Sequence, residues 1–171
     1  MSHRNSNQNE FLVYPLLRSD HRRNRDRGER IEMRVVLDTS VLVAAARSRR
    51  GASSALLLRL LDRTFVPAIS VPLFVEYEAT LLRSENLLDR DAATVEWFLD
   101  FLLSVSHLQD VFFAWRPALP DPDDDFILEL AVAAGCRYIV THNVRDFRGS
   151  EKWGIRVATP SAFLELIETQ T

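Results

Sequence analysis

Acidic residues that follow apolar segments are the feature of this sequence most suggestive of chemistry. Asp38 comes directly after the apolar run at 34–37, and Asp146 lies a few residues beyond a second run at 138–140. Further acids stand at 121–125, before a helical pattern, and Glu76 lies about one turn into another helical pattern. Ligands of open parallel sheets bind at the carboxyl ends of the strands. We therefore expect these carboxylates to share one edge of a sheet.

A divalent cation is the chemistry that such a set of acids indicates. Carboxylates held close together raise one another's pKa and lower stability, and a bound cation removes that penalty. Hard oxygen ligands suit Mg²⁺ or Mn²⁺. Zinc is not expected, because the single Cys136 has no cysteine partner and neither His107 nor His142 has a histidine four residues away. We expect one or two magnesium or manganese ions.

Each of these acids also has a purely structural explanation. Asp38 is a favourable N-cap for a helix that follows it. Glu78 competes with Glu76 for the functional role, although Glu76 stands between apolar neighbours. The run at 123–125 complements a helix dipole, and Asp146 could stabilise a turn. No single acid decides the matter, and their common placement at the end of a sheet is the stronger argument.

Alternating strand and helix patterns must position these residues. We predict strands at 34–37, 65–70, 111–113, 138–141 and 155–158. We predict helices at 52–63, 72–82, 91–104, 123–134 and 160–168, the fourth of them closed by Gly135. Strands separated by helices of this length pair in parallel through right-handed crossovers. The expected fold class is α/β, an α/β/α sandwich with a parallel sheet of about five strands.

Composition divides the chain into an arm and one domain. The 171 residues are 47% hydrophobic, enough for one packed core, which we assign to residues 33–171. Residues 1–32 are polar and densely charged, and we predict a poorly ordered or extraneous N-terminal arm there. Its charge could serve RNA or a partner protein. Alternatively, it is an upstream extension, and the domain begins at Met33.

Several classes of protein are disfavoured by the same numbers. No apolar run reaches the roughly 18 residues of a membrane span, and the N-terminus lacks a signal-peptide pattern. We expect a cytoplasmic protein. Only 5 glycines are present, without the spacing of a glycine-rich nucleotide site. The net charge of −3 excludes little, because 20 of the 21 basic residues are arginine, a side chain suited to phosphate. Genome composition explains that arginine usage equally.

Three segments of the chain resemble a known family. Residues 35–45, 121–131 and 139–147 are similar to the first, third and fourth motifs of PIN domains, and the resemblance covers residues 33–168. The subgroup that the chain resembles most is the bacterial VapC-like toxins of toxin–antitoxin pairs.

The resemblance implies a set of site residues. Four carboxylates would be catalytic and would bind the metal: Asp38, Glu76, Asp124 and Asp146. Accessory roles would fall to Ser40, Asp121, Thr141 and Asn143. Many relatives carry Asp where this chain has Asn143, so a second ion would lose one charged ligand. Arg47, Arg49 and Arg50 would grip the RNA backbone, unless they merely form an exposed loop.

The implied activity is hydrolysis of RNA phosphodiester bonds by a metal-activated water. The expected partners are RNA, an antitoxin protein and a second copy of the chain in a homodimer. Two alternatives stay open: a housekeeping RNA-processing nuclease, and a catalytically weak module that binds RNA or protein. A phosphoacceptor receiver domain would need an acidic pair near the first strand, and a dehalogenase-type phosphatase would need Asp at position 40, which is Ser.

Overall fold

A parallel sheet forms the centre of the protein in the computed structural model, which describes residues 33–87, 90–112 and 118–169. Within these residues the strands are β1 (Arg34–Leu37), β2 (Val66–Ile69), β3 (His107–Leu108), β4 (Tyr138–Val140) and β5 (Arg156–Ala158). Their order is β3-β2-β1-β4-β5, and every neighbouring pair is parallel. The central strand β1 carries Val35, Val36 and Leu37 fully buried, as expected for a strand covered on both faces.

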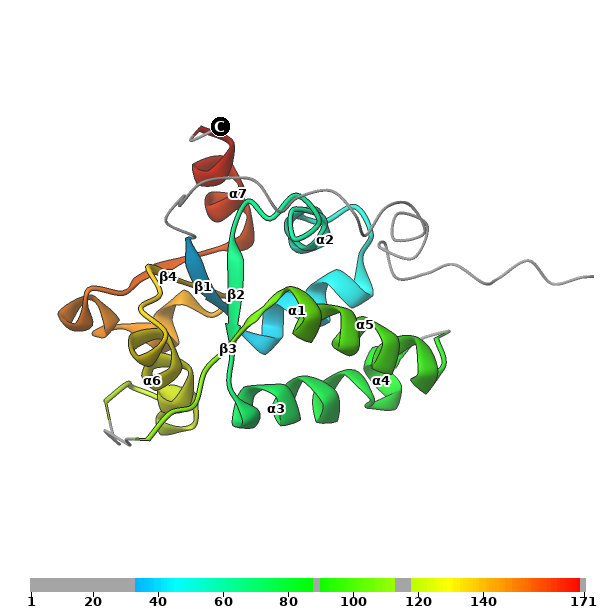
Figure 1. Ribbon diagram of the computed structural model, residues 1–171, viewed down its shortest axis with the longest axis horizontal. Coiled ribbons are helices and arrows are strands. Elements are labelled where there is room, and N and C mark those ends of the chain that lie inside the picture. The colour runs from blue at the N-terminus through cyan, green and yellow to red at the C-terminus, as the bar shows by residue number, and fades with distance from the viewer. Residues whose placement is uncertain (1–32, 88–89, 113–117, 170–171) are drawn as a thin grey trace, which may run out of the picture.

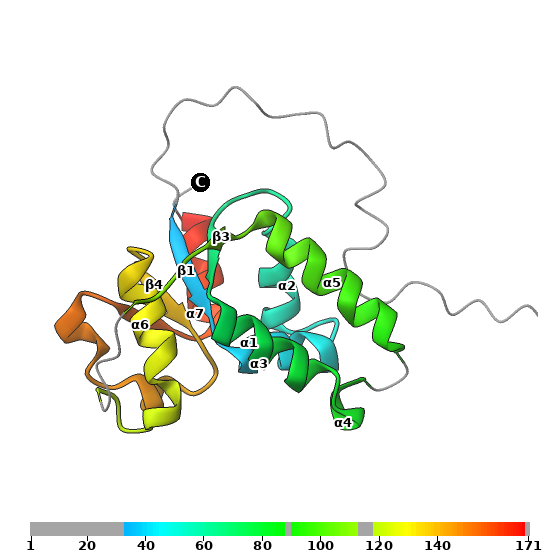
Figure 2. The ribbon, with the colours of Figure 1, turned by 60° about the horizontal axis from the view of Figure 1, so that its bottom comes forward.

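Helices cover both faces of this sheet. They are α1 (Thr39–Arg47), α2 (Ala52–Leu58), α3 (Val71–Leu81), α4 (Ser84–Leu87), α5 (Ala92–Val105), α6 (Asp125–Ala133) and α7 (Pro160–Thr169). Short 3₁₀ helices are η1 (Pro122–Asp124), η2 (Val144–Phe147) and η3 (Ser150–Trp153). Helix α6 packs on β1, β2 and β4 from one side, while α1, α2 and α7 lie together on the other (Figures 1 and 2). The expected α/β/α sandwich with a five-stranded parallel sheet is confirmed.

The strand predicted at 111–113 is wrong for Val111 and Phe112, and position 113 lies outside the described residues. The edge strand is instead β3, which pairs His107 with Ala68 and Leu108 with Ile69 of β2. Helix α5 ends at Val105, so the chain meets β2 at once, and the amide of Gln109 takes the last carbonyl of β2, that of Ile69, at 2.9 Å. No strand is left for Val111 and Phe112 to pair with, and Phe112 is 90% exposed. High β-propensity without an available neighbour does not make a strand.

Other boundaries shift by a few residues. The helix expected at 52–63 ends as α2 at Leu58, and the turns after it include Arg63 at a φ of +49°. The helix expected from 123 begins with the 3₁₀ turn η1 before α6 starts at Asp125. The predicted arm at 1–32 lies outside the described residues. In the described part of the chain, none of the helices has the length and apolar character needed to cross a membrane.

Gly135 ends α6 in a Schellman motif. Its amide donates to the carbonyl of Val132 at 3.1 Å, and the amide of Cys136 donates to that of Ala131 at 2.8 Å. This pair of bonds requires a left-handed residue between them, and Gly135 has a φ of +63°. The motif turns the chain directly into β4, which leads to Thr141 at the end of the strand.

Gly135→Ala should lower the free energy of unfolding by about 1–2 kcal/mol, the cost of a left-handed backbone for a residue with a Cβ. Gly135→Asn is the matched control and should lose less, because asparagine tolerates this conformation. Urea unfolding of the three proteins measures the difference. Equal midpoints for Gly135→Ala and wild type would contradict the motif.

Candidate active site

A closed hydrogen-bond network holds one oxygen of Asp38. Its Oδ2 accepts from the hydroxyl of Ser40 and, at 2.6 Å, from the hydroxyl of Thr141. Each hydroxyl oxygen in turn accepts a backbone amide: His142 donates to Ser40 at 3.1 Å, and Asn143 donates to Thr141 at 2.9 Å. Because the amides occupy the hydroxyl lone pairs, the hydroxyl hydrogens are directed to the carboxylate. The expected accessory roles of Ser40 and Thr141 thereby have a geometric basis.

The other oxygen of Asp38 is left for a ligand. Asp38 occupies the N-cap position of α1, yet its side chain caps no amide of that helix. In the described residues Oδ1 accepts no hydrogen bond, although the side chain is only 6% exposed. A buried carboxylate with one oxygen fixed and one unused is an unfavourable cap and a suitable cation ligand. Helix capping therefore does not explain the Asp38 side chain.

Tyr77 of α3 holds the carboxyl end of β1 by a hydrogen bond. Its hydroxyl donates to the carbonyl of Leu37, the residue before Asp38, while the Asp38 amide donates to Val140 of β4 at 2.9 Å. Burial raises the pKa of Tyr77 well above its usual value, and the charges of Asp38 and Glu76 raise it further. Tyr77 is therefore a neutral donor that fixes the strand end.

Helix α3 brings Glu76 to the same edge. The hydroxyl of Thr39, the first residue of α1, donates to Oε1 of Glu76. Glu76 is partly buried and its charge acts on the other acids, whereas Glu78 is exposed. Of the two glutamates left open by the sequence, Glu76 is the one that the structure places at the cluster.

The pKa of Asp124, at the end of η1, is affected by the other predicted acids. Its pKa is raised to about 7, first by burial and then by the charges of Asp38, Asp121, Asp146 and Glu76. Each of these four carboxylates therefore lies within electrostatic reach of Asp124. The structure therefore brings together acids from the ends of β1 and β4, from α3 and from η1. We call these five residues the acid cluster.

The acidic run before α6 separates into different roles. Asp125 is fully buried and accepts from the amides of Ala118 at 3.1 Å and Leu119 at 2.8 Å, so it holds the preceding loop. Asp121 caps η1 by accepting from the amide of Asp123 at 3.0 Å. Asp124 makes no such side-chain bond to an amide and lies at the cluster.

Asp146 belongs to η2, which the buried Phe147 anchors in the core. The turn is closed by the backbone, with the Asp146 amide donating to the Asn143 carbonyl at 3.0 Å. In the described part of the chain the Asp146 carboxylate forms no hydrogen bond, so stabilising a turn does not explain it. The Asn143 side chain is exposed and does not cap η2.

The chemistry of the acid cluster fits a divalent cation. Within the described residues, none of its carboxylates forms an ion pair with Lys or Arg, since the ion pairs there involve Arg59. No three acidic, histidine or cysteine side chains of the described residues converge closely enough to hold an ion by themselves. Mg²⁺ usually keeps several of its waters and binds through one or two carboxylates, so such an arrangement suits it better than zinc.

The three arginines proposed to grip RNA lie away from the cluster. Helix α1 separates them from Asp38 by nine residues, about 13 Å along its axis. Arg47 donates to Oδ1 of Asn86 at 2.8 Å, which fastens α4 to α1. Arg49 and Arg50 lie exposed in the turn before α2.

Sequence reasoning missed three polar residues around the site. Thr39 and Tyr77 adjoin predicted site residues in the sequence, so their positions offered a hint. Ser53 offered none: it lies at the start of α2, and its hydroxyl is 2.8 Å from Nε2 of His142 at the end of β4. That contact ties α2 to the loop that supplies the two amides.

Asp124→Asn should stabilise the protein at pH 8 in EDTA. A carboxyl with a folded pKa near 7, against an ordinary value of 3.8, loses its proton less readily in the folded state. Folding stability therefore falls as pH rises from about 4 to 7, and the neutral side chain avoids that loss. Thermal melts at pH 4 to 8 should show the advantage of the variant growing with pH.

The exposed neighbour Asp123 provides the control. Asp123→Asn should change the melting temperature little at any pH in this range. An Asp124→Asn protein that melts with the pH dependence of the wild type would show that Asp124 is not crowded by the other acids.

Comparison with known proteins agrees with this geometry. Residues 34–145, more than half of the chain, match the family model of the PIN domain. No curated protein matches the chain. PIN domains are usually nucleases and typically use divalent metals. With the sheet, the acid cluster and the family model in agreement, the chain belongs to the PIN domain family, whose activity is in general of the nuclease type.

Proposed function

We propose that this protein is a magnesium- or manganese-dependent endoribonuclease. The observation that carries the proposal is the acid cluster: carboxylates from four separate segments share one edge of the sheet, and no basic side chain of the described residues pairs with them. Such a cluster lowers stability unless a cation binds to it. A site retained at that cost is better explained by function than by folding.

Four carboxylates would hold the metal, one or two by direct contact and the others through its waters: Asp38 through its unused oxygen, Glu76, Asp124 and Asp146. When bound, one or two ions supply charge stabilisation at the phosphate and a water of lowered pKa. The chain's own contribution is orientation. Ser40 and Thr141 keep Asp38 in one rotamer.

Metal binding would also change the protonation of Asp124. With a pKa of about 7, Asp124 carries a proton in a substantial fraction of molecules at neutral pH. Binding a cation requires the ionised form, so metal uptake releases that proton. Asn143 keeps an amide oxygen but adds no charge, which favours tight binding of one ion over two.

Arginine near the cluster supports RNA as the substrate. Arg145 and Arg148 are exposed on either side of Asp146, on the rim formed by η2. A guanidinium can grip a phosphate by two parallel hydrogen bonds. These two arginines stand nearer to the acids in the chain than Arg47, Arg49 and Arg50, which remain candidates for a more distant part of the strand.

Asp38→Asn should reduce Mg²⁺-dependent cleavage of single-stranded RNA by about 100-fold or more, because several kcal/mol of charge stabilisation depend on the metal. The wild type should be inactive in EDTA and should recover with Mg²⁺ or Mn²⁺. Gel analysis of end-labelled RNA measures the rates. Cleavage that is equal in both proteins would refute the mechanism, and RNA binding without cleavage would favour the catalytically weak module.

Glu76 and Glu78 provide a matched pair on one helix. Glu76→Gln should lose most of the activity, whereas Glu78→Gln, an exposed change of the same chemistry, should keep it. Mg²⁺ should also raise the melting temperature of Glu78→Gln and not that of Asp38→Asn. This readout does not depend on turnover.

We further propose that the nuclease is the toxin of a toxin–antitoxin pair, acting as a homodimer until an antitoxin binds it. The resemblance of the motif segments to VapC-like toxins supports this assignment. A housekeeping RNA-processing nuclease is the competing assignment within the same chemistry.

Induced expression in a bacterial host separates the two assignments. A toxin should stop growth within a few generations, Asp38→Asn should not, and co-expression of a small adjacent gene should restore growth. Unimpaired growth with a protein that cleaves RNA in vitro would favour the housekeeping nuclease. Light scattering of the purified protein tests the dimer.

A further inference from the structure

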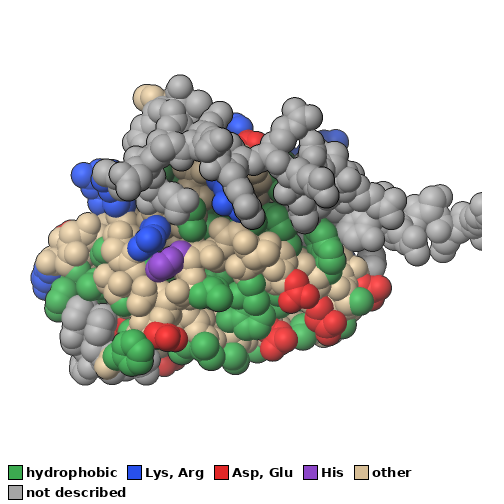
Figure 3. All heavy atoms as spheres, viewed as in Figure 1, with side chains coloured by type: hydrophobic (Ala, Val, Ile, Leu, Met, Phe, Trp, Pro, Cys, Tyr) green, Lys and Arg blue, Asp and Glu red, His purple; other side chains and the backbone are tan. Residues whose placement is uncertain are grey.

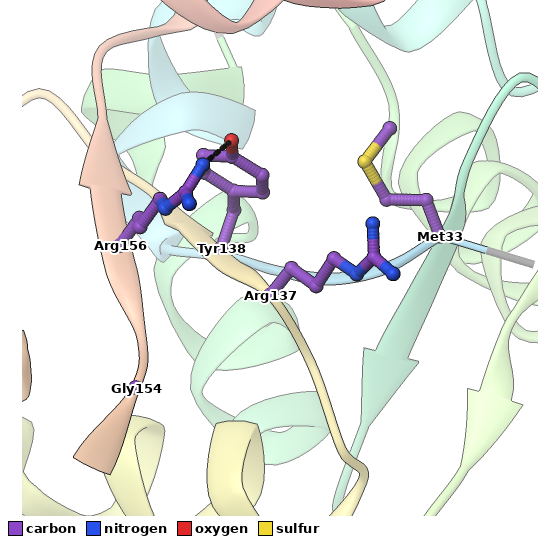
Figure 4. A pocket seen from close by; sticks show the side chains of 5 residues that line it. All are labelled: Met33, Arg137, Tyr138, Gly154 and Arg156. Carbon is purple, nitrogen blue, oxygen red and sulfur yellow. Dashed lines mark hydrogen bonds between the residues drawn. The ribbon is translucent and has the colours of Figure 1, made fainter.

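A pocket lies at the opposite edge of the sheet from the acid cluster. It has a volume of about 300 Å³ and is lined by Met33, Arg137, Tyr138, Gly154 and Arg156 (Figure 4). These residues stand at the amino ends of β1, β4 and β5, or just before them. We call it the arginine pocket. No carboxylate is among its described lining residues.

The register of the sheet places the arginines there. The amide of Arg137 donates to the carbonyl of Arg34 at 3.1 Å, and the amide of Arg156 donates to that of Arg137 at 3.0 Å. Three arginines thus follow one another across three adjacent strands. Arg34 turns away and donates to the carbonyl of Ala134 at 3.1 Å, which leaves Arg137 and Arg156 to the pocket.

Arg156 is held in a fixed position. Its Nη1 donates to the hydroxyl of Tyr138 at 3.0 Å, and its guanidinium carbon lies 5.8 Å from the centre of the same ring (Figure 4). The hydroxyl accepts this bond, so its own hydrogen stays available to an oxygen of a ligand. Cation–π contact of this kind orders a guanidinium before a ligand arrives.

Arg137 provides the second cation. Its side chain extends toward Met33 in Figure 4 and forms no hydrogen bond or ion pair within the described residues. On the face shown in Figure 3, most acidic side chains lie along the lower margin and most basic ones in the upper half. Acidic and basic side chains are therefore largely segregated on this face.

We propose that the arginine pocket binds a phosphate group, carried by a ribonucleotide or by a nucleic-acid strand. Two guanidinium groups and one phenol hydroxyl are donors that match phosphate oxygens. Tyr138 and Met33 add apolar surface for the attached sugar or base. The volume is at the lower end of the range of about 300–1,000 Å³ for ligand pockets, which suits a group of this size.

The pocket is a separate site from the acid cluster. Arg137 and Thr141 are four residues apart along β4, about 13 Å at 3.3 Å per residue. One phosphate cannot contact both ends of the sheet. Binding here would anchor a strand or a nucleotide without placing its phosphate at the acids, so the proposal does not rest on the nuclease activity.

Binding of adenosine monophosphate and of a short single-stranded RNA to the full chain in EDTA tests the proposal. Arg137→Gln and Arg156→Gln should each weaken binding of the true ligand about tenfold or more, because a charge-assisted contact is lost. For RNA, each substitution should also reduce the slope of log affinity against log salt by about 0.7. Arg83→Gln, an exposed change in the turn between α3 and α4, should alter neither.

Tyr138→Phe separates a built pocket from general positive charge. It keeps the net charge and the buried ring but removes the acceptor of Arg156, and we expect a threefold to tenfold loss of affinity. Thermal melts should confirm that each variant folds. Loss with RNA alone identifies a strand as the source of the phosphate, and loss with the nucleotide alone identifies a free nucleotide. Unchanged binding in both arginine variants, an equal loss in Arg83→Gln, or no effect of Tyr138→Phe would overturn the proposal.

Discussion

The rest of the site depends on the hydrogen bonds to one oxygen of Asp38. A carboxylate that is 6% exposed has lost most of its contact with water and needs hydrogen-bond donors from the protein instead. Ser40 and Thr141 supply those donors, and each is oriented by an amide of the segment that follows β4. The network joins the adjacent strands β1 and β4 at their carboxyl ends. It therefore fixes the position of Asp38 and the path of the loop that carries Asp146.

The acid cluster works against the stability of the fold that carries it. The pKa of Asp124 is raised because its burial and the neighbouring charges make ionisation unfavourable. Two hydrogen bonds between α3 and its neighbours keep the acids in place. Tyr77 of α3 donates to the carbonyl of the residue before Asp38, and Thr39 of α1 donates to Glu76 of α3. An edge of repelling carboxylates held by neutral donors is an arrangement that folding alone does not require. Active sites commonly combine function with such local cost.

Most of the fold could be predicted from the sequence, because its pattern is local. Apolar β-branched runs and helical spacing located four of the strands and the helices α2, α3, α5, α6 and α7 within a few residues, but they gave no range for α1. The failure was β3, because the β-prone Val111 and Phe112 lie outside the sheet. The position of an edge strand depends on where the preceding helix ends and on the length of the strand with which it pairs. Neither property can be read from the residues at 111–113.

By itself, the sequence determined which residue types stand at the ends of strands, and the resemblance of its motifs to a family implied which acids would share a site. Tertiary structure decided which contacts each acid makes. It separated Glu76 from Glu78, and it gave Asp125 to the loop at 118–119 while leaving Asp124 at the cluster. It also brought Arg137 and Arg156 to one pocket through strand register. The burial of a side chain and its hydrogen-bond partners depend on contacts between segments that are distant in the chain. A single sequence shows the residues of each segment but not which segments meet.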